Sequence, residues 1–506
     1  MMKSKVFLLL SIIILLTVSI KYVGKEKIRM SFNDETRGET SEIVDIEKKE
    51  VIDISGWKEE NGNWYYIDKN TGEKVKGWKT IDGNKYFFNP MSGIRWKGLL
   101  KLSEKEKYFF DEEGILLKNC QRGNYIINEE GLIVRTILTL EEQEERKVQM
   151  QPMVDEILKK YGTVSAGIAL IEDGEVTNTW EYGYAVKNSV PMETDTKIRI
   201  ASISKVVVAM NIFKLQDEGI LDIDEKIGSY WGFDIANPKY PDKPITLRSI
   251  LSHTSSIADR EEYANLEGYL MRNNVFSGAM PLSEASYSYS NYAFAVGGAT
   301  MEKAAGKTIY DISDQYFFEP MGIDASFAAG RLEHSGLLAN LYYSGGSIAR
   351  NKETMQGFMG YDTPGKNGAF FPGGLCISAG DMAKMICILV NDGVYQGNRY
   401  LSEESVSTME EAFCTVDFHG VQVTQCFPLK YLSHIYGESN LYFHTGSAYG
   451  VYSLFSYNPE TKNGVVVITV GASGVCDENG IYSVCGEVSE LLYKEANKLI
   501  VLEEKE

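Results

Sequence analysis

Alternating and continuous apolar stretches predict the main elements of the C-terminal two thirds of the chain. Residues 451–457 alternate apolar and polar positions, residues 458–464 are a turn, and residues 465–470 are almost entirely apolar, which is the pattern of a β-hairpin. Residues 206–215 are apolar nearly all round, have the length of a helix and are followed by Gly219. They therefore predict a buried helix.

These elements predict a domain of the α+β or α/β class. We expect an antiparallel sheet built from strands near residues 164–183 and 443–471, with a C-terminal helix from about residue 482 to 499 covering it. A mainly helical insertion should occupy about residues 206–370. A functional site is expected in the cleft between the sheet part and the helical part.

Aromatic residues in the N-terminal part recur with a period of 21 residues. Gly56-Trp57 returns as Gly77-Trp78, and the aromatic pair that begins at Tyr65 returns at Tyr86. Fainter copies begin at Tyr108 and Tyr125. Each unit is typical of an aromatic β-hairpin that cannot bury its apolar face alone, so residues 54–134 should form a stacked β-hairpin solenoid.

The N-terminus carries an export signal. Lys3 and Lys5 precede an apolar run at residues 6–20, which has the length of a secretory h-region and is short for a spanning helix of about 20 residues. Residues 17–19 offer only a poor cleavage site, so residues 1–24 are either a signal peptide or a retained membrane anchor. In both cases the remainder of the chain should face the outside of the cell.

Two connecting segments are predicted from composition, one between the signal and the repeats and one between the repeats and the C-terminal domain. Residues 25–53 are charged and poor in aromatics, which predicts a flexible spacer. Residues 135–150 are assigned to a linker, and helical spacing over residues 138–160 leads into the first helix of the following domain. The C-terminal domain is expected to span residues 151–502.

The net charge and the lack of metal-binding or nucleotide-binding motifs in the sequence argue against several classes of function. A net charge of −19 over 506 residues argues against nucleic acid as a partner and limits membrane contact to the N-terminal segment. Five histidines and seven cysteines form no metal-binding spacing, and no nucleotide-binding glycine loop is present, so neither a metal nor another cofactor is expected. Cys414 with Cys426 and Cys476 with Cys485 are candidate disulfides, but the odd total leaves the pairing open.

Ser202 and Lys205 have the spacing of a nucleophile and its base. They are three residues apart at the start of the predicted helix, so both face one side of it. Unpaired N–H groups and the helix dipole at that end favour an alkoxide on Ser202. Burial should lower the pKa of Lys205, so that its neutral amine accepts the serine proton.

Two further segments could supply the other walls of an acyl-transfer site. On a loop before a second apolar helix, Tyr289 offers a phenol for proton relay and Asn291 a carboxamide for a substrate amide. His444 and Thr445 offer polar contacts to a carboxylate, and Gly446 would let a substrate backbone pair with the strand edge. The N–H groups of Ser202 and Ser447 are candidates for an oxyanion hole.

Residues 154–500 resemble the penicillin-recognising serine hydrolases of the class C β-lactamase and D-alanyl-D-alanine carboxypeptidase type. The resemblance is carried by Ser202-Ile203-Ser204-Lys205, Tyr289-Ser290-Asn291 and His444-Thr445-Gly446, in that order. Framework stretches similar to the family occur at residues 166–174, 245–255, 319–322 and 372–375. The resemblance implies a β-lactamase/transpeptidase-like fold, with Ser202 as nucleophile, Lys205 as base, Tyr289 as proton relay, and Asn291 and Thr445 as substrate contacts.

Two positions depart from the family pattern. Class C β-lactamases usually carry lysine where this chain has His444, whereas histidine resembles certain D,D-carboxypeptidases and D-amino-acid esterases. Ser256 stands where the family commonly has glycine, which should alter a loop but not the chemistry. We interpret His253, beside Ser252 and Thr254, as structural rather than as part of a catalytic triad.

The repeats resemble the cell-wall-binding repeats of choline-binding and clostridial surface proteins. In that family, aromatic residues of adjacent repeats form cages for a quaternary ammonium. Trp57, Trp64, Tyr66 and Trp78 are the candidate wall-ligand residues, and Leu99 stands where a third tryptophan is expected. The alternative is that these aromatics only pack the hairpins.

The sequence therefore predicts an exported serine hydrolase that acts through an acyl-enzyme on D-amino-acid-containing cell-wall peptide or D-alanylated polymer. We expect it at the extracellular face of a Gram-positive-like bacterial cell, membrane-anchored or secreted and wall-associated, with choline or wall polysaccharide as a partner of the repeats. The alternatives are a β-lactamase or general esterase, and a penicillin-binding sensor without turnover or a wall-binding adhesin.

Overall fold

The computed structural model describes residues 22–30, 44–51, 55–60, 62–103, 106–123, 125–135, 138–272 and 274–501. The chain divides into two compact units, one of Met1–Asn119 with Ile127–Ile133 and one of Cys120–Ile126 with Val134–Glu506. The apolar run at residues 6–20 lies outside the described residues. None of the helices in the described ranges has both the length and the apolar character needed to cross a bilayer.

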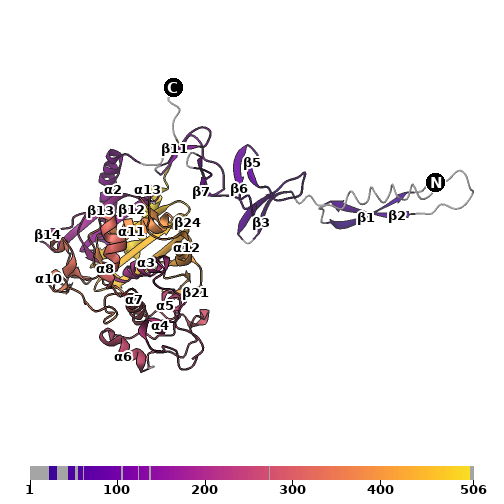
Figure 1. Cartoon of the computed structure of the whole chain (residues 1–506). Coiled ribbons are helices and arrows are strands. Elements are labelled where there is room, and N and C mark those ends of the chain that lie inside the picture. The colour runs from indigo at the N-terminus through magenta and orange to yellow at the C-terminus, as the bar shows by residue number, and fades with distance from the viewer. Residues whose placement is uncertain are drawn as a thin grey trace, which may run out of the picture. The chain divides into compact units, whose positions relative to one another are not determined.

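The first unit contains a row of short aromatic hairpins, drawn in indigo and purple in Figure 1. Trp57 of the first hairpin packs on Tyr86 of the second, with ring centroids 5.0 Å apart, and Trp78 of the second packs on Tyr108 of the third at 4.8 Å. Each of these two tryptophans thus packs on the next hairpin along the chain, as expected for units that are stable only when stacked. The hairpins are formed by strands β3 (Gly56–Glu60) with β4 (Asn63–Ile67), β5 (Gly77–Ile81) with β6 (Asn84–Phe88), and β7 (Gly98–Lys101) with β8 (Lys107–Phe110).

The segment predicted to be a flexible spacer contains two strands. β1 (Tyr22–Met30) pairs antiparallel with β2 (Val44–Val51), so residues 25–53 are not a structureless connection throughout. The prediction rested on the high charge of this segment and overlooked the alternation of Val44 and Ile46 with charged residues, which is a strand pattern.

The second unit is built on one antiparallel sheet of nine strands in the order β14-β13-β12-β26-β25-β24-β23-β22-β21. The predicted strands and hairpin form its centre, while β21 to β23 were not predicted because they are short and mix apolar with polar residues. The strands are β12 (Ser165–Glu172), β13 (Glu175–Val186), β14 (Val190–Pro191), β21 (Cys414–Phe418), β22 (Val421–Gln425), β23 (Lys430–Ile435), β24 (Glu438–Ala448), β25 (Val451–Asn458) and β26 (Asn463–Val470).

The two faces of this sheet are covered by different helices because alternate strand residues point to opposite sides. Ile168 and Leu170 pack with helices α2 (Leu140–Lys160) and α13 (Ser483–Ala496). Ala169 and Ile171 belong to the larger core that contains α11 (Ala379–Val390). The sheet is therefore buried on both faces, as Figure 1 shows for its orange and yellow strands.

A mainly helical region lies between the sheet strands in sequence, as predicted. Its two longest helices are α3 (Ser204–Asp217) and α7 (Asn291–Ala305), which share the larger core. Shorter helical elements are α4 (Gly228–Trp231), α5 (Leu247–Leu251), α6 (Leu266–Met271), α8 (Ile309–Ser313), α9 (Glu319–Met321) and α10 (Lys352–Gln356), and α12 (Glu403–Glu410) follows α11. Small two-stranded pairs complete it: β15 (Ile198–Arg199) with β18 (Cys376–Ile377), β16 (Leu341–Tyr342) with β17 (Ile348–Arg350), and β19 (Val394–Tyr395) with β20 (Asn398–Arg399).

The segment predicted to be a linker is helical from Leu140 onward. Thr139 caps α2 in a capping box with Glu142, so the helix begins eleven residues before the expected start of the domain at residue 151. Arg146 of this helix is buried and makes a bidentate ion pair with Glu172 of β12, with the shorter of its two contacts at 2.5 Å. Residues 140–150 are therefore part of the C-terminal unit rather than a linker.

One strand of the expected repeat region also belongs to the C-terminal unit. β9 (Cys120–Arg122) pairs antiparallel with β27 (Leu499–Val501) near the end of the chain. The Tyr125 hydroxyl, close to β9, donates a hydrogen bond to Asp173 at 3.1 Å. The boundary between the units passes through the remaining short strands, β10 (Tyr125–Ile127) and β11 (Ile133–Arg135).

All seven cysteines are free thiols, so neither Cys414–Cys426 nor Cys476–Cys485 is a disulfide in this structure. Six of the seven are buried. Cys476 lies 3.3 Å from Nδ1 of His419 instead of bonding to Cys485.

Candidate active site

Ser202 lies on a tight turn at the start of α3. It is the central residue of a 3₁₀ turn over Ala201–Ile203, two residues before α3 begins at Ser204. Ala201 has a φ of 56°, a left-handed conformation that costs a non-glycine residue about 1–3 kcal/mol. The turn is fixed by hydrogen bonds from the Ser204 hydroxyl to Ala201 O and from the Ser453 hydroxyl to Ile200 O. The strained turn thus holds Ser202 against the sheet.

Lys205 has three oxygen partners. Its Nζ lies 3.0 Å from Ser202 Oγ, 2.8 Å from Asn291 Oδ1 and 2.8 Å from the carbonyl oxygen of Pro372. Burial, together with the nearby charge of Lys430, lowers the pKa of Lys205 well below its usual value.

The hydrogen-bond partners define what a neutral Lys205 can do. A neutral amine has two N–H bonds and one lone pair, and Asn291 Oδ1 and Pro372 O can only accept hydrogen bonds. When both N–H bonds are donated to those oxygens, the lone pair is left for the Ser202 hydroxyl. This is the arrangement that a general base for Ser202 requires.

Tyr289 is the third group at the nucleophile. Its phenol is hydrogen-bonded to Ser202, and its ring centroid lies 5.0 Å from Lys205 Nζ. Burial raises the pKa of Tyr289, so its resting form is the neutral phenol. Ser290 caps α7, which places Asn291 as the first residue of that helix rather than on the loop as predicted.

His253 supports this loop, in line with its interpretation as structural. Its ring is 4.3 Å from the Tyr289 ring, centroid to centroid, and its Nδ1 accepts a hydrogen bond from Ser290 N–H. Ser256 has a φ of 63°, which explains why glycine suits this position in the related family. A hydrogen bond from Asn237 Nδ2 to Ser256 Oγ holds the serine there.

β24 forms the opposite wall of the site. A Cβ on Gly446 would lie only 2.9 Å from the backbone nitrogen of Ser202, so glycine is needed for this approach. The pairing of β24 with β23 ends at Phe443 opposite Lys430, whereas its pairing with β25 continues to Ala448. The β24 edge after Phe443 is thus the place where a substrate backbone could add as a strand.

His444 differs from its predicted role. It is buried, 2% exposed, and its Nδ1–H donates to Thr445 O at 2.6 Å. Burial and the charge of Lys430 lower the pKa of His444, so the ring is neutral and its Nε2 carries a lone pair. A neutral ring in this tautomer cannot donate to a carboxylate, contrary to the contact that we expected.

Lys430 is a site residue that the sequence analysis missed. It is 2% exposed, begins β23 and lies 5.7 Å from the centroid of the Tyr289 ring. Burial lowers its pKa to about 8, so it is still mostly protonated at neutral pH. Lys430 belongs to no sequence motif and lies in a strand that was not predicted. Only its burial beside the other site residues identifies it as part of the site.

The four wall-ligand candidates lie in the first unit, where three of them meet. Trp57 is 6.4 Å from Trp64 and 5.3 Å from Tyr66, each in edge contact. The Arg95 guanidinium lies over both Trp57 and Trp64, and the Lys85 amine lies over Trp78 at 4.3 Å. The chain's own cations therefore occupy tryptophan faces on which a quaternary ammonium would bind.

Comparison with known proteins identifies the family. The Beta-lactamase family profile matches residues 150–480, well over half of the chain. The chain belongs to this family. A second profile, described as a putative cell wall binding repeat, matches residues 55–73 and 76–90. The resemblance predicted from the motifs is confirmed, and the β-lactamase family is one of serine hydrolases.

Curated relatives of the β-lactamase family domain include penicillin-binding protein 4* of Bacillus subtilis (strain 168). It is 27% identical over 198 residues, which are 36% of this chain and 42% of the relative. The D-alanyl-D-alanine-carboxypeptidase/endopeptidase AmpH of Escherichia coli (strain K12) is 27% identical over 177 residues, 32% of this chain and 45% of AmpH. The matches thus span less than half the length of these relatives.

A solved structure confirms the predicted fold class. The β-lactamase/D-alanine carboxypeptidase from Yersinia pestis, complexed with citrate, superposes with a TM-score of 0.54 at 17% identity. The match covers 69% of this chain and 99% of that structure. At this level of identity the comparison concerns the fold alone.

Proposed function

We propose that this chain is a cell-surface serine hydrolase that acts through an acyl-enzyme on D-amino-acid-containing cell-wall substrates, as a D,D-carboxypeptidase or a D-alanyl esterase. The observation that carries the proposal is the hydrogen bonding of Lys205, whose two acceptor-only partners leave its lone pair for Ser202 Oγ, 3.0 Å away. The similarity to the D-alanyl-D-alanine-carboxypeptidase/endopeptidase AmpH supports this class of substrate.

In the proposed acylation step, Lys205 takes the proton of Ser202 as its oxygen attacks the substrate carbonyl. In this proposal the backbone N–H groups of Ser202 and Ser447 stabilise the oxyanion, and the close approach of Gly446 to the backbone nitrogen of Ser202 supports this assignment. Tyr289 then donates its phenolic proton to the leaving amine or alkoxide and regains one from protonated Lys205. Collapse of the tetrahedral intermediate leaves the acyl group on Ser202.

Deacylation follows the same route in reverse. A water molecule attacks the acyl carbonyl, gives one proton to the Lys205–Tyr289 pair and forms a carboxylic acid as the C–O bond to Ser202 breaks. The proton returns to Ser202 Oγ. The same two residues therefore serve both half-reactions.

The site charge favours substrates that end in a carboxylate. His444 is neutral and cannot supply that charge, whereas Lys430 is the protonated group beside Tyr289. A free carboxylate follows the scissile bond in a D-alanyl-D-alanine stem. We therefore rank cell-wall peptide above a general ester.

We also propose that the repeats attach the enzyme to the cell wall, outside the membrane. The matched wall-binding repeats at residues 55–73 and 76–90 support this location. A choline headgroup would have to displace the Arg95 and Lys85 side chains from the tryptophan faces. A wall polysaccharide is the alternative ligand of the repeats.

Labelling with an active-site serine probe tests the nucleophile and its base. We expect one adduct by intact mass on the wild type and none on Ser202→Ala. Lys205→Ala should acylate roughly 10²- to 10⁴-fold more slowly, because it lacks the general base. Lys214→Ala is the matched control on the same helix, since Lys214 pairs with Glu218 at 2.7 Å away from the site, and it should acylate normally.

Two outcomes oppose the proposal. An equal adduct on Ser202→Ala would exclude this serine as the nucleophile, and unchanged kinetics in Lys205→Ala would exclude the lysine as the base. A hydrolysis panel of a D-alanyl-D-alanine stem, D-alanylated teichoic acid, a small ester and a β-lactam then ranks the substrates. A stable adduct without turnover on all four would favour a penicillin-binding sensor.

A further inference from the structure

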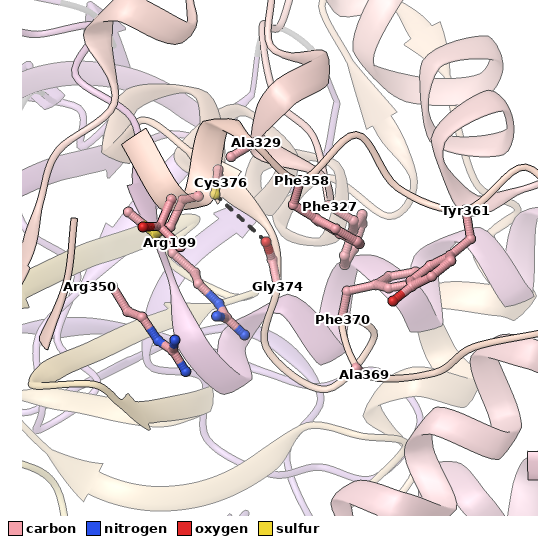
Figure 2. Close-up of a pocket in the computed structure, with 12 residues that line it drawn as sticks. Arg199, Phe327, Ala329, Arg350, Phe358, Tyr361, Ala369, Phe370, Gly374 and Cys376 are labelled. Carbon is pink, nitrogen blue, oxygen red and sulfur yellow. Dashed lines mark hydrogen bonds between the residues drawn. The ribbon is translucent and has the colours of Figure 1, made fainter. Parts of the chain in front are cut away.

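A cavity of about 250 Å³ lies beside the candidate active site and has two chemically different ends. Figure 2 shows two guanidinium groups on one side of Gly374 and a group of aromatic rings on the other. The residues that define the two ends are Arg199, Arg350, Phe327, Phe358, Tyr361 and Phe370.

The polar end carries two arginines that meet on one tyrosine. The guanidinium carbons of Arg199 and Arg350 lie 5.0 Å and 4.4 Å from the centroid of the Tyr449 ring, and the two arginines together lower the pKa of its phenol. Arg199 Nε donates to Gly373 O at 2.8 Å. Within residues 138–272 and 274–501, no carboxylate forms an ion pair with either arginine. Donors therefore remain for an anionic ligand.

The apolar end is a set of mutually packed rings. Phe370 is 6.1 Å from Tyr361 in stacked geometry and 6.2 Å from Phe358, centroid to centroid. Phe370 and Phe327 are buried, 5% and 2% exposed. A ligand with an apolar or aromatic group would extend this cluster, and each aromatic pair contributes beyond the area that it buries.

The residues that line the cavity lie close to Ser202, both along the chain and in space. Arg199 precedes Ser202 by three residues, and a Cβ on Gly373 would lie 3.2 Å from the carbonyl carbon of Ala201. Tyr449 directly follows the end of β24 at Ala448. The cavity therefore lies at the end of the open β24 edge.

The order of residues along β24 indicates that the cavity lies on the acyl side of the scissile bond. The proposed proton donor to the leaving group, Tyr289, has Lys430 beside it, and Lys430 pairs with Phe443 at the start of the open edge. Tyr449 and the arginines lie at the other end of that edge. Because the leaving group occupies the Lys430 end, the acyl part of an added substrate strand extends toward the arginines.

We propose that this cavity binds the acyl part of the substrate, and that it selects acyl groups that combine an apolar, preferably aromatic, side chain with a free carboxylate. The carboxylate pairs with Arg199 and Arg350, and the apolar group packs on Phe358, Tyr361 and Phe370. The inference rests on the proposed acyl-enzyme function and specifies its substrate class.

Four matched p-nitroanilides test the two requirements separately, on the full chain: N-succinyl and N-acetyl derivatives of D-phenylalanine and of D-alanine. The succinyl group adds a carboxylate and the phenylalanine adds a ring. We expect kcat/KM for succinyl-D-phenylalanine to exceed that of its acetyl analogue at least tenfold. Arg350→Gln should reduce this ratio about tenfold or more, and Arg350→Lys should restore part of it.

Arg272→Gln is the matched control. Arg272 also lies over a tyrosine, 5.8 Å from the centroid of the Tyr269 ring, and it does not line the cavity. Its succinyl-to-acetyl ratio should equal that of the wild type. Hydrolysis of all four substrates with equal kcat/KM would overturn the cavity assignment and leave the serine hydrolase function intact.

A binding measurement decides the case in which none of the four is hydrolysed. Calorimetry with Ser202→Ala compares N-succinyl-D-phenylalanine amide with its N-acetyl analogue. Tighter binding of the succinyl compound, lost in Ser202→Ala/Arg350→Gln, supports the cavity although the proposed reaction fails. Equal affinity for the two compounds overturns the inference.

Discussion

Two lysines buried in the same site are expected to act in opposite protonation states. In the proposed mechanism, Lys205 must be neutral to accept a proton from Ser202, and Lys430 must be charged to attract a substrate carboxylate. Burial disfavours the charged form of both, but the charge of Lys430 acts on Lys205 and lowers its pKa further. Lys430 is thus expected to set the protonation state of the base as well as the charge of the site.

Lys430→Met tests this coupling through the pH dependence of acylation. In the wild type, the rate should rise as Lys205 loses its proton and fall above about pH 8 as Lys430 loses its own. Without the Lys430 charge the pKa of Lys205 rises, so the acidic limb should move to higher pH. The alkaline limb near pH 8 should disappear.

The same variant should lower kcat/KM for substrates with a terminal carboxylate by about 10- to 100-fold, the effect of losing one charge-assisted hydrogen bond. Lys494→Met, on the exposed face of α13, is the control and should keep both limbs. A Lys430→Met profile with both limbs unmoved would contradict the coupling.

At the scale of elements, the sequence predicted strand β24 but not its neighbour β23. The alternation after His444 indicates a strand, and Gly446 in the motif indicates a close approach, both of which are local signals. The open edge has another origin: β23 starts at Lys430, opposite Phe443, and no other strand of the described residues pairs with the remainder of β24 on that side. The sequence of β24 does not encode where β23 begins, so the open edge could not be predicted from β24 alone.

Gly446→Ala tests the approach of β24 to the nucleophile. Its new Cβ would lie 2.9 Å from both Ser202 N and Ile200 O, so strand or turn must shift and move the oxyanion-binding groups. We expect acylation of Ser202 to slow by about 100-fold or more, the effect of losing one oxyanion donor. Probe labelling followed by intact mass measures it.

Gly336→Ala controls for the substitution itself. A Cβ at Gly336 meets nothing within 4 Å, so this variant should acylate at the wild-type rate. Circular dichroism of both variants separates a local shift from unfolding. Normal acylation by a folded Gly446→Ala protein would show that the close approach is not required.

At the scale of the whole molecule, the repeat period and the structural units do not coincide. The faint fourth repeat contributes β9 to the C-terminal unit, where it pairs with β27. The buried Tyr125 adds its hydrogen bond to Asp173. The start of the fourth repeat, Cys120–Ile126, is thus part of the C-terminal unit rather than of the repeat unit.

Two truncations test whether β9 stabilises the hydrolase. A chain of residues 138–506 should melt about 2–3 °C below a chain of residues 118–506, because it lacks the β9 ladder and the burial of Tyr125, together about 2 kcal/mol. Acylation should be equal, since Ser202, Lys205 and Tyr289 are present in both. Equal melting temperatures would place β9 outside the folded hydrolase.

The sequence by itself determined the family, the fold class and the three segments that meet at Ser202, because motif spacing and hydrophobic periodicity are local properties of the chain. Only the tertiary structure decided the state of each group: the burial of Lys205 and Lys430, the neutral ring of His444, the cations over the tryptophans and the arginine-lined cavity. These depend on desolvation and on charges brought close by segments far apart in sequence, and no single segment encodes them.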